Sequence, residues 1–494
     1  MTVSTHKCWP IRQKDIKTYF HFDAMASRHQ LLRWATDPDY VSRKAFFPLI
    51  RFKEEWTRFR KGGSKRIKSR PIRYCSRIDA AIFAYYRFRW SEHYEKYLRS
   101  SNIQHIPIAY RKIGKPKVGN KSNIEFARDV FDFIKNTGNC DVTVVDISSF
   151  FESLDHDLLR EKLERVIGRD LTNDENSVLS AVTNYSVVDI DPLFERLGLF
   201  DPSTTDRRLR NIDQLRAAGH RRIIEPGRFN DLVCGGDPTL PSLIQRHRAK
   251  YGIPQGTPIS DLLANIYMID FDKRLARWVR KRNGFAYRYS DDVIVVLPTK
   301  NGQRYEIAFE YLQRSIENFG SKLKIKDSKV AVGRFIQLGD RSIYTQIRGQ
   351  SCQNGIEYLG FQYDGQAVQL RNSTLSNAWR KAKRRAHGWA KSHVLRYRTK
   401  GDAWLRSSLN PEDKATEVLR TLTVRQAKEG DVTDWTFNSY VERAKNVFSD
   451  YANNFESQTK RYKRAISKMH VDALEDAIKR HGKRAFFVKT GRLL

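Results

Sequence analysis

Two adjacent aspartates, Asp291 and Asp292, interrupt an apolar, β-prone stretch that reads FAYRYSDDVIVVL over residues 285–297. Aspartate is depleted in β-strands, and a buried carboxylate without a partner is costly. Ser290 and the two aspartates are turn formers, so a strand–turn–strand hairpin accounts for their position. Such a hairpin is either purely structural or holds a metal ion at its turn, and the stretch alone does not decide between the two.

A third aspartate, Asp146, ends another β-prone run, VTVVD, much earlier in the chain, so only the fold can bring it to the hairpin. The order of strands and helices around the three carboxylates is compatible with a ferredoxin-like palm, in which helices back a central antiparallel sheet. There the end of one strand faces the turn of the neighbouring hairpin, so that two or three carboxylates converge. They stay ionised together only with a cation between them.

Mg²⁺ is the expected cation, because the donors are oxygens and neither His nor Cys lies beside them. It binds through one or two carboxylates and the phosphates of a substrate. Two such ions are the known device for in-line nucleotidyl transfer, and Mn²⁺ could replace them.

The elements that must position these carboxylates are legible in outline. We expect helices over 11–60, 77–98, 124–138 and 303–320, and a Gly/Pro loop followed by a long helix over 251–280. We expect a basic loop and a short strand over 61–74, a strand that runs into a helix over 140–159, a strand over 322–332 and a hairpin over 355–365. Basic helices are expected from about 370. The Arg-rich patch within 160–250 is less legible and could be an inserted element.

The charge is strongly basic and uneven. The 494 residues carry a net charge of +34, of which residues 1–110 contribute +14 and residues 371–494 contribute +15. A nearly balanced centre between two basic flanks suits a catalytic core with arms that hold a polyanion. An anionic membrane surface, or solubility alone, would also account for the charge. Aromatic residues interleaved with basic ones, as in FAYYRFRW (83–90), favour nucleic acid, because bases stack on such rings.

Other bulk features exclude several protein classes. The five cysteines are scattered and form no CxxC pair, which argues against a zinc site and a disulfide framework. No apolar run is long enough to cross a membrane, and the N-terminus lacks the apolar core of a secretory signal. We therefore expect a cytoplasmic protein without a membrane partner.

Several blocks, in this order, resemble the core of bacterial-type reverse transcriptases. These are KSRPIRY, VVDISSFFESLDH, YGIPQGTPISDLLANIY, YRYSDDVIVV, LKIKDSKV and EYLGF, spread over roughly residues 65–365. The resemblance implies an α+β, right-hand polymerase: fingers and a ferredoxin-like palm, followed by a helical thumb. It implies a helical extension (1–60), fingers (61–139), a palm (140–365, with a possible insertion at 160–250) and a basic helical thumb and RNA-binding region (366–494).

The same resemblance implies roles for single residues. The catalytic and metal-binding set would be Asp146, Asp291 and Asp292 with the backbone carbonyl of Ile147. Around the incoming nucleotide would lie Phe151, Gln255, Gly256, Lys329, and Arg70 with Lys65 or Lys68. The bulky ring of Phe151 would exclude a 2′-hydroxyl and so select deoxynucleotides. Primer and template would meet Tyr289 and Pro254, and Arg111 and Lys112 form a second, lower-ranked pair for phosphates.

Simpler explanations stand beside several of these roles. Phe151 could be a core residue, Lys329 a solvated charge, Arg70 and Lys68 general RNA contacts, and Gln255 a turn residue. An RNA-dependent RNA polymerase would use the same palm, although Phe151 argues against it. A catalytically silent RNA-binding scaffold would need only the charge and the fold.

The fingers blocks look most like those of defence-associated reverse transcriptases, which are related to retron and group II intron enzymes. The resemblance implies an RNA-directed DNA polymerase that copies a dedicated, structured noncoding RNA and acts against phage. Its partners would be that RNA, deoxynucleoside triphosphates and the DNA product. The primer, the phage trigger and a homo-oligomeric state are left open.

Overall fold

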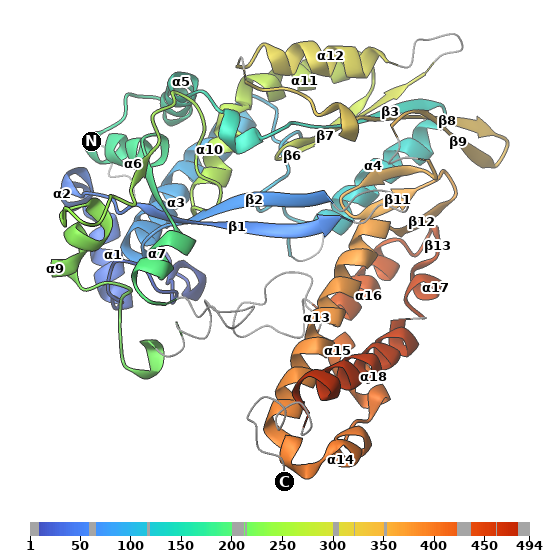
Figure 1. The fold of residues 1–494 in the computed structure, drawn as a ribbon. Coiled ribbons are helices and arrows are strands. Elements are labelled where there is room, and N and C mark those ends of the chain that lie inside the picture. Colours follow the sequence, from blue (N-terminus) through green and yellow to red (C-terminus); the bar gives the residue numbers. More distant parts are fainter. Residues whose placement is uncertain are drawn as a thin grey trace.

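The computed structural model describes residues 9–58, 66–115, 119–199, 212, 215–299, 306–320, 322–349, 353–421, 436–460 and 462–482. Its helices and strands form two sheet-containing parts side by side and a helical lobe that extends away from them at the C-terminal end (Figure 1). The predicted mixture of helices and sheets is confirmed, with an antiparallel sheet at the centre; the two other sheets each contain one parallel strand pair.

A five-stranded antiparallel sheet lies at the centre, in the order β6-β7-β3-β8-β9. Its strands are β3 (Cys140–Asp146), β6 (Phe285–Tyr289), β7 (Asp292–Pro298), β8 (Ala331–Leu338) and β9 (Arg341–Arg348). β3 is buried on both faces. Val142 packs into the cluster below the sheet that includes Phe131, and Val145 packs into the opposite cluster that includes Leu263. This alternation fixes which face of β3 each residue occupies, including Asp146.

Helices cover both faces of this sheet (Figure 1). Helix α4 (Asn123–Thr137) ends at Gly138, as predicted, and it begins at a capping box of Ser122 and Glu125. The long helix predicted within 251–280 is two helices, because the helix is interrupted at Met268. The remaining helices near the five-stranded sheet are α5 (His156–Ile167), α10 (Ser260–Tyr267), α11 (Ile269–Arg280) and α12 (Ile307–Glu317), with short 3₁₀ turns η2 (Phe150–Ser153) and η4 (Asp327–Lys329).

A second sheet has the order β2-β1-β4-β5. Its strands are β1 (Leu49–Arg58), β2 (Arg66–Tyr74), β4 (Ser186–Asp189) and β5 (Gln245–Arg246). The prediction of helix throughout 11–60 is wrong for β1, where Ile50 and Phe52 alternate with Arg51 and Lys53 and pair along β2. β4 and β5 come from the region 160–250, so part of that region extends this second sheet rather than the five-stranded one.

The long helix α3 (Arg77–Ser100) follows β2 and begins at the N-cap Ser76. Smaller helices surround it: η1 (Gln13–Asp15), α1 (Arg28–Thr36), α2 (Pro38–Arg43), α6 (Asn173–Thr183), α7 (Ile190–Arg196), α9 (Pro226–Phe229) and the π-helical turn η3 (Asn230–Cys234). The predicted strand over 322–332 is wrong for most of its length, because β8 begins only at Ala331.

The predicted hairpin near 355–365 forms the third sheet: β10 (Ile356–Tyr358), β11 (Phe361–Tyr363), β12 (Ala367–Leu370) and β13 (Ala452–Asn453). The C-terminal helices are α13 (Asn372–Tyr397), η6 (Arg398–Lys400), α14 (Asp402–Ser407), α15 (Pro411–Thr421), α16 (Phe437–Val447), α17 (Phe455–Lys460) and α18 (Tyr462–His481). One stripe of α13, Ala378, Ala382, Ala386, Ala390 and Val394, is buried, and α13 packs along α18.

Within the described residues, Cys75, Cys140 and Cys234 are free thiols; Cys8 and Cys352 lie outside this part of the chain. None of the helices described is long and apolar enough to cross a membrane.

Candidate active site

The end of β3 meets the turn of the β6–β7 hairpin. Asp146 lies directly opposite Asp292 in the strand register. Just beyond it, the backbone N–H of Ile147 donates to the carbonyl of Asp291 at 3.0 Å. The turn itself requires Ser290 in the left-handed region, at φ 61°. The fold therefore brings together the three carboxylates that the sequence separates.

These carboxylates lie close enough for their charges to repel. Asp146 is 5% exposed. Burial and the charge of Asp146 raise the pKa of Asp291. Burial, followed by the charges of Asp291 and Asp146, raises the pKa of Asp292 to about 7. The cluster thus carries more negative charge than its own surroundings neutralise, which is the condition under which a cation binds.

One cation of the chain already lies on this cluster. The ammonium of Lys329 forms an ion pair with both carboxylate oxygens of Asp146. The η4 turn is brought there by the N–H of Lys326, which donates to the carbonyl of Asp146 at 2.9 Å. Lys329 therefore lies at the carboxylate cluster, and its place near the leaving pyrophosphate stays a prediction.

The donor set suits a hard divalent cation. All three side chains are carboxylates, and a lysine ammonium marks the position where positive charge is favoured. Among the residues that the structure describes, no three His, Cys, Asp or Glu side chains form a ready-made metal cage. Two carboxylates completed by substrate phosphates are the arrangement that Mg²⁺ usually adopts.

Phe151 lies in the η2 turn that follows β3. The chain enters this turn through Ser149 at φ 48°, and Phe151 is half-buried, with its ring 5.6 Å from that of Phe150. Its carbonyl accepts a hydrogen bond from Ile253 N–H at 2.7 Å. The turn that carries the predicted sugar gate is therefore tied to the loop that contains Pro254, Gln255 and Gly256.

That loop is docked against β2. The carbonyl of Gln255 accepts from the N–H of Arg73 at 2.9 Å, and the carbonyl of Pro254 accepts from the Ser260 hydroxyl at 2.6 Å. Gly256 has φ 120°, and a Cβ atom there would lie 2.3 Å from the carbonyl oxygen of Arg73. Only glycine permits this approach, so the Gln-Gly pair serves turn geometry at the least.

The basic residues of β2 divide into two groups. Arg70 is exposed, and its charge is among those that oppose the rise in the pKa of Asp291, so it lies within electrostatic reach of that carboxylate. The side chains of Lys65 and Lys68 lie outside the described part. Sequence reasoning missed Arg73, which is buried and pairs with Glu152 at 2.7 Å, joining β2 to the η2 turn. Its place in the KSRPIRY block was the available signal.

Tyr289 is half-buried at the end of β6, with its ring 6.4 Å from that of Tyr110. Tyr110 was also missed. It is 45% exposed, its hydroxyl lies 3.3 Å from that of Ser290, and its backbone is left-handed at φ 63°. A left-handed backbone at a bulky residue is uncommon, and here it places Tyr110 beside the β6–β7 turn.

The neighbouring prediction for Arg111 is wrong. Its guanidinium is 6% exposed and pairs with both oxygens of Glu95 at 2.7 and 2.8 Å. It also donates to the carbonyls of Gln104 and Pro107. This arginine closes the 104–111 loop and is not available to a phosphate. Lys112 is exposed.

Comparisons with known proteins agree with this arrangement. Residues 238–363 match the family described as reverse transcriptase (RNA-dependent DNA polymerase), a stretch that includes Asp291 and Asp292. No curated protein matches the sequence. Residues 238–363 are thus identified as part of a reverse transcriptase domain, and the enzyme class of that domain is RNA-directed DNA polymerase, a nucleotidyltransferase.

Solved structures similar to the chain include three telomerase structures. Apo telomerase from Candida tropicalis truncated from its C-terminal domain aligns at a TM-score of 0.33 and 10% identity, over 63% of this chain and 53% of that one. Apo telomerase from the same species gives 0.35 and 11%, over 89% and 65%. Telomerase from Candida albicans with a TWJ fragment of telomeric RNA gives 0.34 and 11%, over 93% and 68%. The chain thus spans about half to two thirds of these proteins, and scores this low carry no inference about activity.

Proposed function

We propose that the chain is an active RNA-directed DNA polymerase that extends a 3′-hydroxyl with deoxynucleotides by two-metal nucleotidyl transfer. The observation that carries this proposal is the meeting of Asp146, at the end of β3, with Asp291 and Asp292 at the β6–β7 turn. The match of residues 238–363 to reverse transcriptases supports it.

Asp146 and Asp291 would hold the cations, with Asp292 beside them. When bound, Mg²⁺ supplies charge neutralisation at the attacking and leaving oxygens. The chain's own residues orient the substrate. Lys329, which pairs with Asp146 in this structure, and Arg70 would be the cations placed to pair with the triphosphate.

Phe151 would lie against the sugar of the incoming nucleotide. The hydrogen bond from Ile253 N–H to the Phe151 carbonyl fixes the backbone from which the ring projects. A 2′-hydroxyl would collide with it, which favours deoxynucleotides. The Gln255–Gly256 turn, fixed against Arg73, would line the same nucleotide from the template side.

The template would be a dedicated, structured RNA, and the biological role would be defence against phage. The strongly basic flanks support a large polyanionic partner that stays bound. The defence role rests on the likeness of the fingers blocks to defence-associated reverse transcriptases. Recovery of one defined RNA with the protein from its host, rather than a general RNA background, tests the dedicated partner.

The activity is tested by nucleotide incorporation with the full chain and its co-purified RNA. Labelled deoxynucleotides or ribonucleotides are offered with Mg²⁺ to the wild type, to Asp291→Asn and to the control Asp340→Asn, which changes an exposed carboxylate in the β8–β9 turn. We expect deoxynucleotide product from the wild type and the control and none from Asp291→Asn. Sequencing the product identifies template and primer.

Two results would overturn the proposal. A preference for ribonucleotides would indicate an RNA polymerase on the same palm. Absence of product from the wild type, with its RNA bound and with Mg²⁺ or Mn²⁺ present, would indicate an RNA-binding scaffold.

A further inference from the structure

A buried ion pair lies directly beneath the catalytic turn. Arg288, on β6 three residues before Asp291, is fully buried, and so is Asp272 on α11. The guanidinium donates to both oxygens of Asp272 at 2.7 Å each. This two-pronged geometry fixes the plane of the arginine side chain.

The remaining donors of Arg288 reach the turn and its surroundings. One nitrogen, Nη1, lies 3.1 Å from the carbonyl oxygen of Ser290 and 3.1 Å from the side-chain oxygen of Asn265. The amide of Asn265 donates in turn to the carbonyl of Ala109 at 3.0 Å. One guanidinium therefore joins α10, α11, the catalytic turn and the segment that leads to Tyr110.

The backbone of Arg288 is held as firmly as its side chain. Its N–H donates to the carbonyl of Ile106 at 2.8 Å, and its carbonyl accepts from the N–H of Ile108 at 2.9 Å. The loop over 106–110 thus runs alongside β6 and places Tyr110 above the turn, while Asp272 and Asn265 lie below it.

Stability alone does not explain this arrangement. Removing two charges from water is costly, and well-packed apolar residues of similar volume are often as stable as a buried ion pair. What apolar residues cannot supply is a charged donor to the Ser290 carbonyl. Ser290 is left-handed at φ 61°, a conformation that a residue with a Cβ atom adopts only where its surroundings impose it.

We propose that Arg288 and Asp272 are a positioning pair that fixes the Ser290 carbonyl, and through it the orientation of the Asp291 carboxylate toward the cations. Neither residue touches the substrate. The pair acts because Ser290 and Asp291 share a peptide unit, so the carbonyl that Arg288 holds also sets the backbone from which Asp291 projects. This inference rests on the proposed polymerase function.

The test replaces the pair by apolar residues in the full chain, Arg288→Met with Asp272→Leu. A matched control replaces a second ion pair of the same sheet, Arg334→Met with Asp141→Leu. This control pair joins β8 to the start of β3, at the end of that strand away from Asp146, with contacts of 2.7 and 2.8 Å. Thermal unfolding, kcat, KM and the metal concentration for half-maximal rate are measured for each, and Mn²⁺ affinity is measured by electron paramagnetic resonance.

We expect the Arg288/Asp272 variant to remain folded and to lose about 10- to 100-fold in kcat, with a raised metal requirement, weaker Mn²⁺ binding and little change in KM for primer–template. The control pair is expected to keep its kcat and metal requirement. If the apolar variant does not fold, Arg288→Lys is used. It keeps the charge opposite Asp272 but cannot reach Asp272 and Ser290 together, so kcat and Mn²⁺ affinity should still fall.

Wild-type kcat and Mn²⁺ affinity in the apolar variant would overturn the inference, and so would full activity in Arg288→Lys if that variant is used. Equal losses in the two paired variants would also overturn it, because they would reflect general destabilisation. Failure of the proposed function is a separate result: the wild type would then incorporate nothing. The Mn²⁺ measurement would still show whether the pair positions the carboxylates.

Discussion

Phe151 is the residue on which the choice of sugar is expected to depend. Phe151→Ala removes the ring that would collide with a 2′-hydroxyl, so ribonucleotides should become acceptable substrates. We expect the ratio of kcat/KM for deoxynucleotides over ribonucleotides to fall about 10-fold or more. Single-nucleotide incorporation with each substrate measures it. The control is Phe150→Ala, which removes a neighbouring ring that is 3% exposed and should affect stability instead. Unchanged selectivity in Phe151→Ala would make Phe151 a core residue.

Asp292 gives a prediction about pH and stability. Its pKa in the folded chain is about 7, above its ordinary value of 3.8, because burial and two neighbouring carboxylates oppose its ionisation. Between these values the folded state binds the proton more tightly than the unfolded state, so ionisation destabilises the metal-free fold as pH rises.

In metal-free buffer, Asp292→Asn should therefore unfold a few degrees above the wild type at pH 8, and the two should converge as pH falls toward 4. Thermal unfolding between pH 4 and 8 with a chelator present measures this difference. Added Mg²⁺ should stabilise the wild type more at pH 8 than at pH 5. A difference that stays constant with pH would show that Asp292 ionises normally.

Site residues could be predicted where they belong to a sequence motif. They could not be predicted where only a tertiary contact identifies them. Asp146, Asp291 and Asp292 stand in recognisable blocks, and the fold brings them together. Arg288 and Tyr110 were missed because the fold makes their contacts, Arg288 with Asp272 and Tyr110 with Ser290, and no local pattern reveals them. Arg111 was misassigned for the same reason. A basic loop residue has the same local pattern whether it meets a phosphate or, as here, the carboxylate of Glu95.

Elements were predictable where their periodicity and end signals agree. Helix α4 carries an amphipathic pattern, a capping box and a terminal glycine, and it forms within a residue or two of its predicted ends. β1 carries a short strand-like alternation at Ile50, Arg51, Phe52 and Lys53, which the helix prediction overlooked, and its pairing with β2 and β4 is decided by tertiary contacts. The break between α10 and α11 also lacks a local signal, since neither glycine nor proline marks it.

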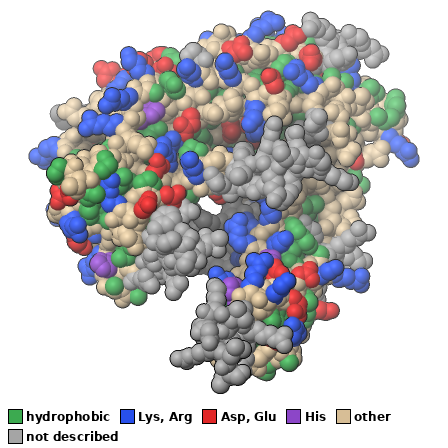
Figure 2. All heavy atoms as spheres, viewed as in Figure 1, with side chains coloured by type: hydrophobic (Ala, Val, Ile, Leu, Met, Phe, Trp, Pro, Cys, Tyr) green, Lys and Arg blue, Asp and Glu red, His purple; other side chains and the backbone are tan. Residues whose placement is uncertain are grey.

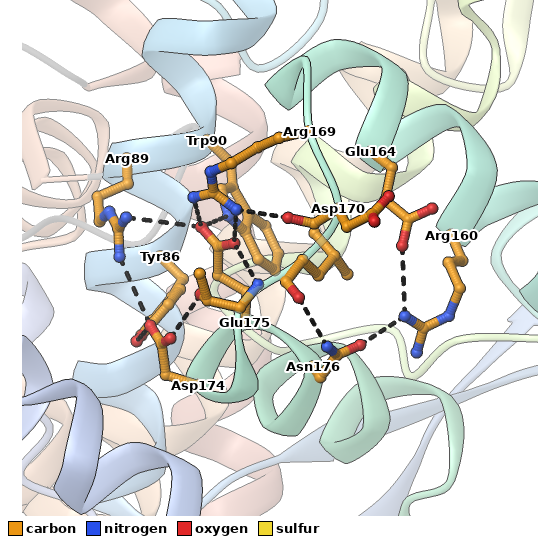
Figure 3. A network of polar contacts seen from close by, with 12 residues as sticks. Tyr86, Arg89, Trp90, Arg160, Glu164, Arg169, Asp170, Asp174, Glu175 and Asn176 are labelled. Carbon is orange, nitrogen blue, oxygen red and sulfur yellow. Dashed lines mark hydrogen bonds and ion pairs between the residues drawn. The ribbon is translucent and has the colours of Figure 1, made fainter.

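A polar network joins α6 to α3 on the side of the molecule away from the C-terminal lobe (Figure 3). Glu175 is 1% exposed and accepts from Arg169 at 2.7 and 3.1 Å, from Thr172 N–H at 3.1 Å and from the Trp90 indole at 3.5 Å. Next to it, Asp174 accepts a hydrogen bond from the Tyr86 hydroxyl. The first turn of α6 thus anchors the helix from which Arg87 reaches the loop at Tyr110.

Glu175→Ala removes the centre of this network. It leaves the Trp90 indole without its acceptor, removes both bonds from Arg169 to a carboxylate and breaks the capping box of α6, so we expect the free energy of unfolding to fall by about 2–4 kcal/mol. Urea denaturation measures the change, and kcat of the folded fraction should stay near the wild-type value. Glu161→Ala removes an exposed partner of Arg165 and should cost only about 0.5 kcal/mol. Equal effects from the two substitutions would contradict the structural role given to the network.

At the scale of the whole molecule, the structure shows on which side of α13 its basic residues lie. The buried alanine stripe of α13 fixes which side of this helix packs along α18. Its basic residues Arg380, Lys381, Lys383, Arg384, Arg385 and Lys391 are therefore exposed. Lys and Arg side chains gather on the C-terminal lobe beside the opening that separates it from the rest of the molecule (Figure 2). Partial desolvation lowers the pKa of Lys381, and the charges of Arg385 and Arg384 lower it further. The basic side chains of this cluster therefore repel one another.

A polyanion would relieve this repulsion, which leads to a prediction on RNA binding. Each phosphate contact made by a lysine or arginine releases counterions, so the logarithm of the binding constant falls linearly with the logarithm of the salt concentration. Lys383→Gln with Arg384→Gln removes two exposed cations of α13 and should flatten that slope by about 1.4–1.8. Filter binding of the co-purified RNA between 50 and 300 mM salt measures it. The control, Lys445→Gln with Lys479→Gln, removes equal charge elsewhere in the same C-terminal region. If both variants change the slope equally, the RNA responds to the net charge of the region and not to the exposed face of α13.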